Sequence, residues 1–178
     1  MEPLSCSPIP SNINPLQNNG FLFAVQKLPE ITFFCQTVTL PELSLPATST
    51  TTPLVNIPFP GDKLDFSQLS VTFLIDSEMK NYIAVHDWLV GLGFPKNHNQ
   101  YANFIKNRTN TLNSSPALAA VSDATLNILG SSSNTVQSIQ FIGAFPTNLQ
   151  YLQLETTNQD TKYLTASATF AYTYYTFD

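Results

Sequence analysis

The chain has 178 residues, which is enough for one domain with a buried core and short for two. Only 11% of the residues are charged, against roughly 25% in ordinary soluble domains. The net charge is -5 and no run of Lys or Arg occurs, so we do not expect tight binding of nucleic-acid phosphates. No apolar segment is long enough for a membrane span, so we do not expect one.

Residues 1–20 contain four prolines and four asparagines without periodicity, which predicts a flexible N-terminal arm. A single domain is expected over 21–178. It opens with alternating apolar residues at 21–27, and Leu28-Pro29-Glu30 then predicts a turn into a second strand at 31–39. We therefore expect an opening hairpin.

The next segment, residues 40–53, is longer than most connections in a compact domain. Its leucines are unusual for a solvated loop, so it either folds back on its own domain or is covered by a neighbouring subunit. The candidate inter-subunit residues are Leu40, Pro41, Glu42, Leu43 and Leu45.

A short strand at 55–60 precedes a clearer one at 68–75, where apolar residues alternate with Ser70 and Thr72. Asp76 or Ser77 is then expected to cap a helix that Gly91 and Gly93 end. Apolar residues at helical spacing predict one packed face. The residues expected to pack this helix onto the sheet are Tyr82, Val85, Trp88 and Leu89; for Trp88, a binding pocket is the less common alternative.

The remaining chain predicts an Asn-rich surface loop at 96–117 and strands at 119–129, 135–143 and 149–155, with turns at 145–148 and 156–160. The closing stretch, 163–175, alternates larger apolar side chains with small hydroxyl-bearing ones. Because successive side chains of a strand point to opposite faces, this strand has one apolar and one hydrated face. The total is about seven strands and one principal helix, a mainly β (α+β) fold.

Residues suited to catalysis or ligand binding are scarce. His86 lies beside Asp87 on the predicted helix, but adjacent helical side chains diverge by about 100 degrees, so we expect no shared catalytic site there. Cys6 and Cys35 fit no metal-ligand spacing, the carboxylates are scattered, and no phosphate-binding glycine motif occurs. We expect no catalytic, metal or cofactor-binding residues, no cofactor and no enzymatic activity.

The order of these elements resembles that of the tail tube proteins of contractile-tailed (myovirus) bacteriophages. The resemblance covers residues 21–177 and includes, near the end, Gly143-Ala144-Phe145-Pro146-Thr147-Asn148-Leu149 followed by Leu152-Gln153-Leu154; no single piece is diagnostic. Its other parts are 23–26, 31–36, Leu40-Pro41, 69–73, Asp76-Ser77-Glu78 and Trp88. The N-terminal arm and the Asn-rich loop depart from the family pattern.

The resemblance implies that six subunits join their sheets into a shared β-barrel ring, flanked outside by the helix, and that rings stack into the hollow tube that conducts DNA during ejection. Partners would be further copies of the chain, the sheath, the baseplate and a tail terminator. Double-stranded DNA would pass without specific binding, and no membrane would be involved. The protein would be made in the host cytoplasm and reside in the virion tail. The lumen-facing residues would be Ser70, Thr72, Thr165, Ser167, Thr169 and Thr173.

Two alternatives remain open at this point. A tube initiator or a tail terminator would use the same fold in a different position. A β-sandwich binding module would instead use Trp88 and the tyrosines at 172, 174 and 175 to hold a ligand.

Overall fold

A computed structural model describes residues 16, 20–93, 99, 120–155 and 163–178. Most of the predicted N-terminal arm and Asn-rich loop, and all of the predicted turn at 156–160, lie outside these residues. In the described part, eleven strands and two helices occur, and the predicted mainly β class is confirmed. Their order is β1 (Phe21–Val25), α1 (Pro29–Phe34), β2 (Cys35–Thr39), β3 (Leu43–Ser44), β4 (Ala47–Thr51), β5 (Asn56–Pro60), β6 (Asp65–Phe66), β7 (Leu69–Leu74), α2 (Lys80–Gly93), β8 (Ser122–Leu129), β9 (Thr135–Leu149), β10 (Thr165–Ala171) and β11 (Tyr174–Phe177).

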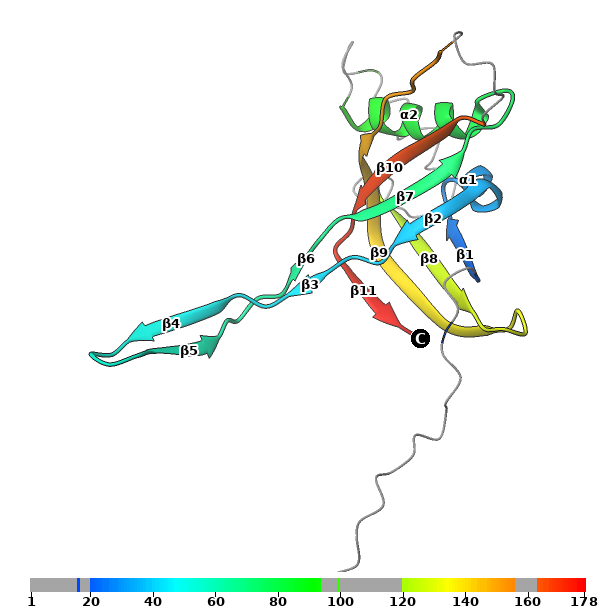
Figure 1. Cartoon of the computed structure of the whole chain (residues 1–178). Helices are drawn as coiled ribbons and strands as arrows, with labels where there is room; N and C mark the ends of the chain where they lie inside the picture. The colour runs from blue at the N-terminus through cyan, green and yellow to red at the C-terminus, as the bar shows by residue number, and fades with distance from the viewer. Residues whose placement is uncertain (1–15, 17–19, 94–98, 100–119, 156–162) are drawn as a thin grey trace, which may run out of the picture.

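One antiparallel sheet forms the body, in the strand order β1-β8-β9-β10-β7-β2, with β11 also paired to β9. The sheet bends so that its two halves face each other (Figure 1). One half contains β1, β8, β11 and the first part of β9, and the other contains the last part of β9 with β10, β7 and β2. The sheet does not close into a barrel within the described chain.

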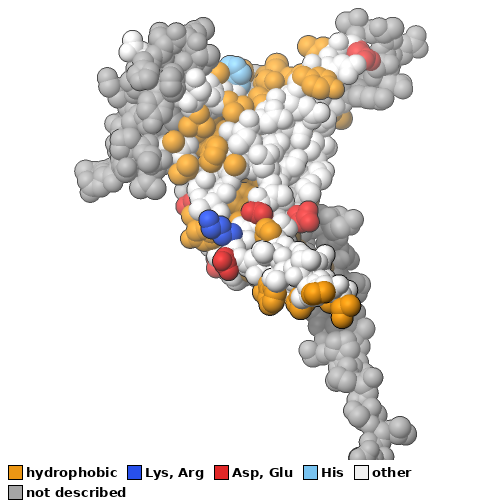
Figure 2. Space-filling model, turned by 90° about the vertical axis from the view of Figure 1, so that its left-hand side faces the viewer, with side chains coloured by type: hydrophobic (Ala, Val, Ile, Leu, Met, Phe, Trp, Pro, Cys, Tyr) orange, Lys and Arg blue, Asp and Glu red, His pale blue; other side chains and the backbone are white. Residues whose placement is uncertain are grey.

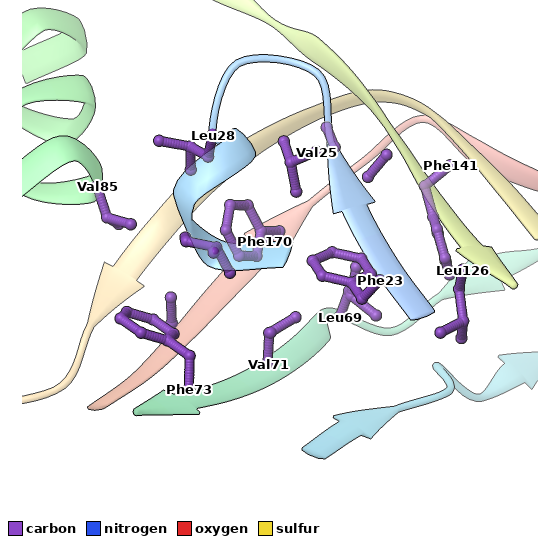
Figure 3. Packing of buried hydrophobic residues seen from close by; sticks show 14 of the residues in the cluster. Phe23, Val25, Leu28, Leu69, Val71, Phe73, Val85, Leu126, Phe141 and Phe170 are labelled. Carbon is purple, nitrogen blue, oxygen red and sulfur yellow. The ribbon is translucent and has the colours of Figure 1, made fainter. Parts of the chain in front are cut away.

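The core lies between the two halves. Phe23, Leu126 and Phe141 on one half face Val71 and other apolar residues of β7 and β10 (Figure 3). The alternating burial along β7 and β10 matches the predicted period of two, because each strand turns only one face toward this core.

Strand β9 corrects the predicted turn at 145–148, because it continues through Pro146 to Leu149. The chain turns instead at Gly143, whose φ of +68° bends the strand from one half-sheet into the other. Proline is tolerated in the strand because, among the described residues, this part of β9 pairs on one side only, with β10. The predicted strand at 149–155 is also wrong: Gln150 donates to Ser167 O and extends the pairing by one residue, and 151–155 form no ladder.

The predicted opening hairpin is wrong as well. Helix α1 separates β1, which pairs with β8, from β2, which pairs with β7. Aromatic and β-branched residues favoured a strand there, yet Pro29 at the start of the helix and Glu30 in its first turn are helix-start signals. Burial of Leu28 and Ile31 holds this turn of helix against the core.

Helix α2 crosses one end of the body (Figure 1). Val85 and Trp88 are fully buried, while Tyr82 and Leu89 are partly buried against the same core. The Trp88 Nε1–H donates to Ala120 O at 3.0 Å, and the Lys27 ammonium lies 5.4 Å from the ring centroid. Within the described residues, no helix is long and apolar enough to cross a bilayer.

The start of α2 differs from prediction, since the helix begins only at Lys80. Asp76 Oδ1 accepts the N–H of Ser77 rather than capping the helix. The buried Asn81 takes over the local bonding: its Nδ2 donates to Leu74 O at 2.6 Å and its Oδ1 accepts the N–H of Tyr82 at 2.8 Å. A cap was expected from residue type alone, but the turn places Met79 at a φ of +58° before the helix can start.

A long two-stranded arm, made of β3 to β6, projects from the body (Figure 1). Strand β4 pairs with β5 and β3 with β6. The arm prolongs β2 and β7, which pair with each other at its base. The predicted long connection at 40–53 is therefore one side of a hairpin.

Candidate functional site

The half-sheet β9-β10-β7-β2 has two chemically different faces. Residues opposite one another on paired strands share a face. On the face away from the core, Thr39, Ser70, Thr169 and Asn148 form one row, and Thr37, Thr72 and Ser167 form a second. Thr72 Oγ1 lies 3.5 Å from Ser167 Oγ. This face therefore offers hydroxyl and amide groups, with no charged side chain in either row.

Five of the six predicted lumen-facing residues lie on this hydroxyl face: Ser70, Thr72, Thr165, Ser167 and Thr169. Thr173 does not, because the predicted closing strand is two strands, β10 and β11, separated by a bend at that residue. The Thr173 N–H donates to Ile142 O, and its Oγ1 lies beside Gly143. Beyond the bend, Tyr175 rather than Tyr174 packs against Phe141.

Both edges of this half-sheet are unpaired within the described residues. Strand β2 pairs only with β7, and β9 residues 145–149 pair only with β10. Exposed strand edges offer N–H and C=O groups to another strand, and β-proteins either protect such edges or pair them. Together, the two edges and the hydroxyl face form a candidate assembly site.

The arm is a second candidate assembly surface. Residues 43–61 contain no charged side chain, although charges are a common protection of isolated β-ribbons against aggregation. Strand pairing places Ile57 and Phe59 on one face with Thr48 and Thr50. Large apolar side chains are exposed along its length: Leu40, Leu43, Leu45, Leu54, Val55, Ile57, Phe59 and Leu64. Of the residues predicted in this segment, only Pro41 is buried, and Glu42 is exposed.

Phe66 and Ser67 join the arm to the body. The Phe66 ring makes edge contacts with Tyr172 and Tyr175, at centroid distances of 6.1 and 5.8 Å. The Tyr172 hydroxyl donates to Ser67 O at 2.8 Å, and Ser67 N donates to Glu42 O. Burial raises the pKa of Tyr172 to about 12, and the neighbouring Tyr175 makes a smaller contribution in the same direction. These contacts fix the base of the arm to β11 and to the bend that precedes it, and nothing in the sequence pattern pointed to them.

The face from which the arm projects carries few charges among the described residues. Figure 2, which looks along the arm from its side of the molecule, shows mostly neutral side chains with a few acidic and basic ones. The expectation that His86 and Asp87 diverge is wrong, because their Nδ1 and Oδ1 atoms lie 3.2 Å apart, although both side chains are exposed on α2. Within the part of the chain that the structure describes, no three His, Cys, Asp or Glu residues could hold a metal ion together.

Cys35 opens β2 and is half-buried. Burial raises the pKa of its thiol to about 11, so it remains a neutral thiol at physiological pH. Cys6 and His98 lie outside the described residues.

Comparison with known proteins gives a family and a fold. A family model described as phage tail tube protein matches residues 9–178. The tail tube terminator protein of Enterobacteria phage T4 is 26% identical over 148 residues, which cover 81% of this chain and 76% of the T4 protein. A chain in the 6-fold symmetrised anti-feeding prophage baseplate has a TM-score of 0.62 at 12% identity, covering 92% of this chain and 95% of that one. A chain of the PVC sheath/tube terminator in the extended state has a TM-score of 0.56 at 14% identity, covering 93% and 97%.

Proposed function

Because this chain belongs to the phage tail tube protein family, we propose that it forms rings at the end of a contractile phage tail tube and acts as the tube terminator. The observation that carries this proposal is the half-sheet with one buried face, one hydroxyl face and two unpaired edges. Such a sheet is suited to become one segment of a larger barrel.

The ring closes through the two edges. Strand β2 of one copy pairs with residues 145–149 of β9 in the next, in a ladder to which Pro146 contributes no N–H. Because the strands alternate in direction across the half-sheet, this contact continues the antiparallel ladder when the copies are related by rotation. Closure removes every open edge of this half-sheet. Six copies per ring agree with the 6-fold symmetry named for one structural relative.

The hydroxyl face lines the bore. Its side chains wet the channel but provide no cation for phosphates, so DNA passes during ejection without releasing counterions to the wall. Ser70, Thr72, Ser167 and Thr169 line the bore, because they lie in the two cross-strand rows, and Thr165 lies on the same face. Thr173 is not part of this proposal.

The arm contacts a neighbouring subunit. Its large apolar side chains are exposed to solvent in the described chain. Packing against a second protein surface removes them from water, which is favourable. Helix α2 lies outside the barrel, where the sheath can approach it, and the baseplate is reached through the tube. No enzymatic activity and no membrane contact are part of this role.

The terminator role is favoured by the tail tube terminator protein of phage T4, which is 26% identical to this chain over 148 residues. The second candidate is the stacking tube subunit, which the description of the family favours. An initiator role at the baseplate uses the same surfaces.

Negative-stain electron microscopy of the purified protein, alone and mixed with preformed tail tubes, tests these roles. The terminator predicts six-fold rings that bind tube ends and do not grow into rods. Long hollow rods from the pure protein identify the tube subunit instead. Globular monomers that ignore tubes contradict both roles.

A further inference from the structure

The hydrogen bonds at the two ends of the β4–β5 ribbon fix which of its backbone groups point outward. Gly61 N donates to Pro46 O at 2.8 Å at the base of the ribbon, and Thr52 N donates to Val55 O at 3.1 Å at its tip. Bonded and non-bonded pairs alternate along an antiparallel ladder. The odd-numbered residues of β4 therefore lie in non-bonded pairs and turn their N–H and C=O groups away from β5: Ala47, Ser49 and Thr51.

The opposite edge of the ribbon is blocked. The partners of these residues on β5 are Pro60, Pro58 and Asn56, and the same alternation turns their backbone groups away from β4. Proline has no N–H, so Asn56 alone offers a donor along this edge of the ribbon. Proline on a strand edge protects that edge against pairing with another strand. The arm therefore has one protected edge, on β5, and one open edge, on β4.

The open edge has no partner within the described residues. Strand β4 pairs there only with β5, and the outward groups of Ala47, Ser49 and Thr51 make no other hydrogen bond. All of β4 is exposed, and residues 43–61 contain no charged side chain, so neither burial nor charge protects this edge. It presents three N–H donors and three C=O acceptors, which is the surface that an extended strand recognises.

The next copy in the proposed ring does not supply this strand. The β4 side of the arm faces that copy, because β4 continues the line of β2 (Figure 1). The first two strands of the next copy do not accompany the arm, since β9 turns away at Gly143 and β10 ends at Ala171. The edge that follows belongs to the next arm and is the proline-blocked β5, three strand spacings or roughly 14 Å away. A partner strand must therefore come from outside the ring.

We infer that the β4 edge of each arm pairs with an extended strand of the tube subunit at the end of the tube that the ring caps. The inference rests on the proposed function, because it assigns the surface through which the terminator ring holds the tube. Backbone hydrogen bonds supply the attachment. The ribbon face that carries Ile57 and Phe59 continues onto the added strand, so that strand presents uncharged β-branched or apolar side chains at alternate positions. The apolar face and the β4 edge are different surfaces, so the arm can contact a ring neighbour while β4 pairs.

Ser49→Pro tests this contact, with Asn56→Pro as the matched control. Each variant removes one outward N–H from the same ribbon, and neither removes a bond between β4 and β5, because both residues lie in non-bonded pairs. Size-exclusion chromatography with light scattering first checks that rings form. Negative-stain electron microscopy then counts capped ends among purified tail tubes over a series of ring concentrations. Ser49→Pro is expected to need at least about tenfold more protein than the wild type to cap half of the ends, whereas Asn56→Pro caps normally.

The outcomes separate the two proposals. Wild-type protein that forms no rings, or rings that bind no tube ends, contradicts the proposed function, and the inference fails with it. Rings of Ser49→Pro that cap tubes at wild-type concentrations overturn the β4 contact and leave the terminator role standing. An equal loss in both proline variants also overturns the contact, because the shape of the arm and not its open edge then matters.

A lysine pair decides the case in which Ser49→Pro forms no rings. Ser49→Lys and Asn56→Lys keep every backbone N–H and lie on the same face of the ribbon. Lysine on a strand edge opposes pairing with another strand, so Ser49→Lys is expected to form rings that lose the tube ends, whereas Asn56→Lys retains them. Normal capping by Ser49→Lys, or an equal loss in both lysine variants, overturns the contact.

Discussion

The backbone N–H of Gly143 donates a hydrogen bond to Asp123 Oδ1 at 3.0 Å, at the place where β9 passes from one half of the sheet to the other. Asp123 lies at a register shift between Ser122 and Ala124 in β8. A carboxylate therefore satisfies a donor that the ladder leaves without a strand partner. The bend and this hydrogen bond connect the half-sheet β9-β10-β7-β2 to the other half of the sheet.

Gly143→Ala is expected to lower the free energy of unfolding by about 1–3 kcal/mol. The φ of +68° disfavours a side chain, and an added Cβ would lie 3.0 Å from Thr173 Oγ1. Chemical denaturation followed by circular dichroism measures the change. Gly93→Ala, at the end of α2, is the control, because a Cβ there meets no atom within 4 Å. Equal stability of the two variants would contradict the importance of the bend.

Trp88→Phe is expected to destabilise the protein by about 1–3 kcal/mol, because it leaves Ala120 O without its indole donor in a buried site. Thermal unfolding measures the effect. Ile83→Ala on the exposed side of the same helix serves as control and should change stability by less than about 0.5 kcal/mol. A binding role for Trp88 would instead leave stability unchanged on substitution, which we do not expect.

Stability is expected to fall with rising pH above about 10 through Tyr172. The folded protein raises the pKa of this tyrosine from 10.0 to about 12, so between these values the unfolded chain loses the proton first. The stabilisation is thus complete below pH 10 and is lost as pH rises toward 12. Urea denaturation at pH 9 and pH 11 should show a smaller loss for Tyr172→Phe than for the wild-type protein. An equal loss would show that Tyr172 does not carry this effect.

Phe59→Ser is expected to leave folding intact and to abolish assembly. The side chain is half exposed on the arm, so unfolding free energy should change by less than about 0.5 kcal/mol, whereas a subunit contact would lose a large apolar group. Size-exclusion chromatography with light scattering measures the assembly. Thr51→Ser, on the opposite face of the same ribbon, should assemble normally. Assembly of the Phe59 variant at wild-type concentrations would remove the arm from the interface.

Lysines on the hydroxyl face are expected to make the ring retain DNA that has been threaded through it. Ser70→Lys with Thr169→Lys adds two cations to one cross-strand row, and each phosphate contact makes binding steeply salt-dependent, with a slope of roughly -0.9 in log affinity per log salt. Electrophoretic retention of linear duplex DNA, but not of closed circular DNA, is the result expected for a lysine-lined bore. Ile83→Lys with Met79→Lys, at exposed positions on α2 and immediately before it, should not distinguish the two forms. Equal retention of circles by the Ser70 and Thr169 variant would place this face outside any channel.

Several parts of the fold could be predicted because local pattern and tertiary packing agree. The alternation along β7, β8 and β10 fixes which faces enter the core, and the spacing of Val85 and Trp88 fixes the buried side of α2. The hydroxyl face follows from the same period of two, which is why Ser70, Thr72, Thr165, Ser167 and Thr169 fall on one side of the sheet.

The errors arose where a local signal competes with tertiary context. Pro146 indicated a turn, but an unpaired sheet edge accepts a residue that lacks an N–H. Residues 31–34 have strand propensity, but Pro29 and the burial of Ile31 select one helical turn. Thr173 fits the alternating sequence pattern, but the chain bends at this residue, beside Gly143, and the strand is interrupted there.

The arm was predicted only in part. Its leucines indicated a covered surface, but contacts between residues far apart in the chain, such as Tyr172 with Ser67, decide that the segment stands out as a ribbon. No period in the sequence encodes such a contact, since the partners are 105 residues apart.

The bend of β9 has a mechanical consequence. One covalent backbone belongs to the assembly edge at 145–149 and, past Gly143, to the layer held by β8 and β11. A force along β9 at that edge passes through the backbone to the part of β9 that pairs with β8 and β11. There it loads many hydrogen bonds together in shear and does not break them one at a time. In the ring that we propose, the barrel wall and the layer outside it share this strand, and the shared strand opposes tearing of the wall.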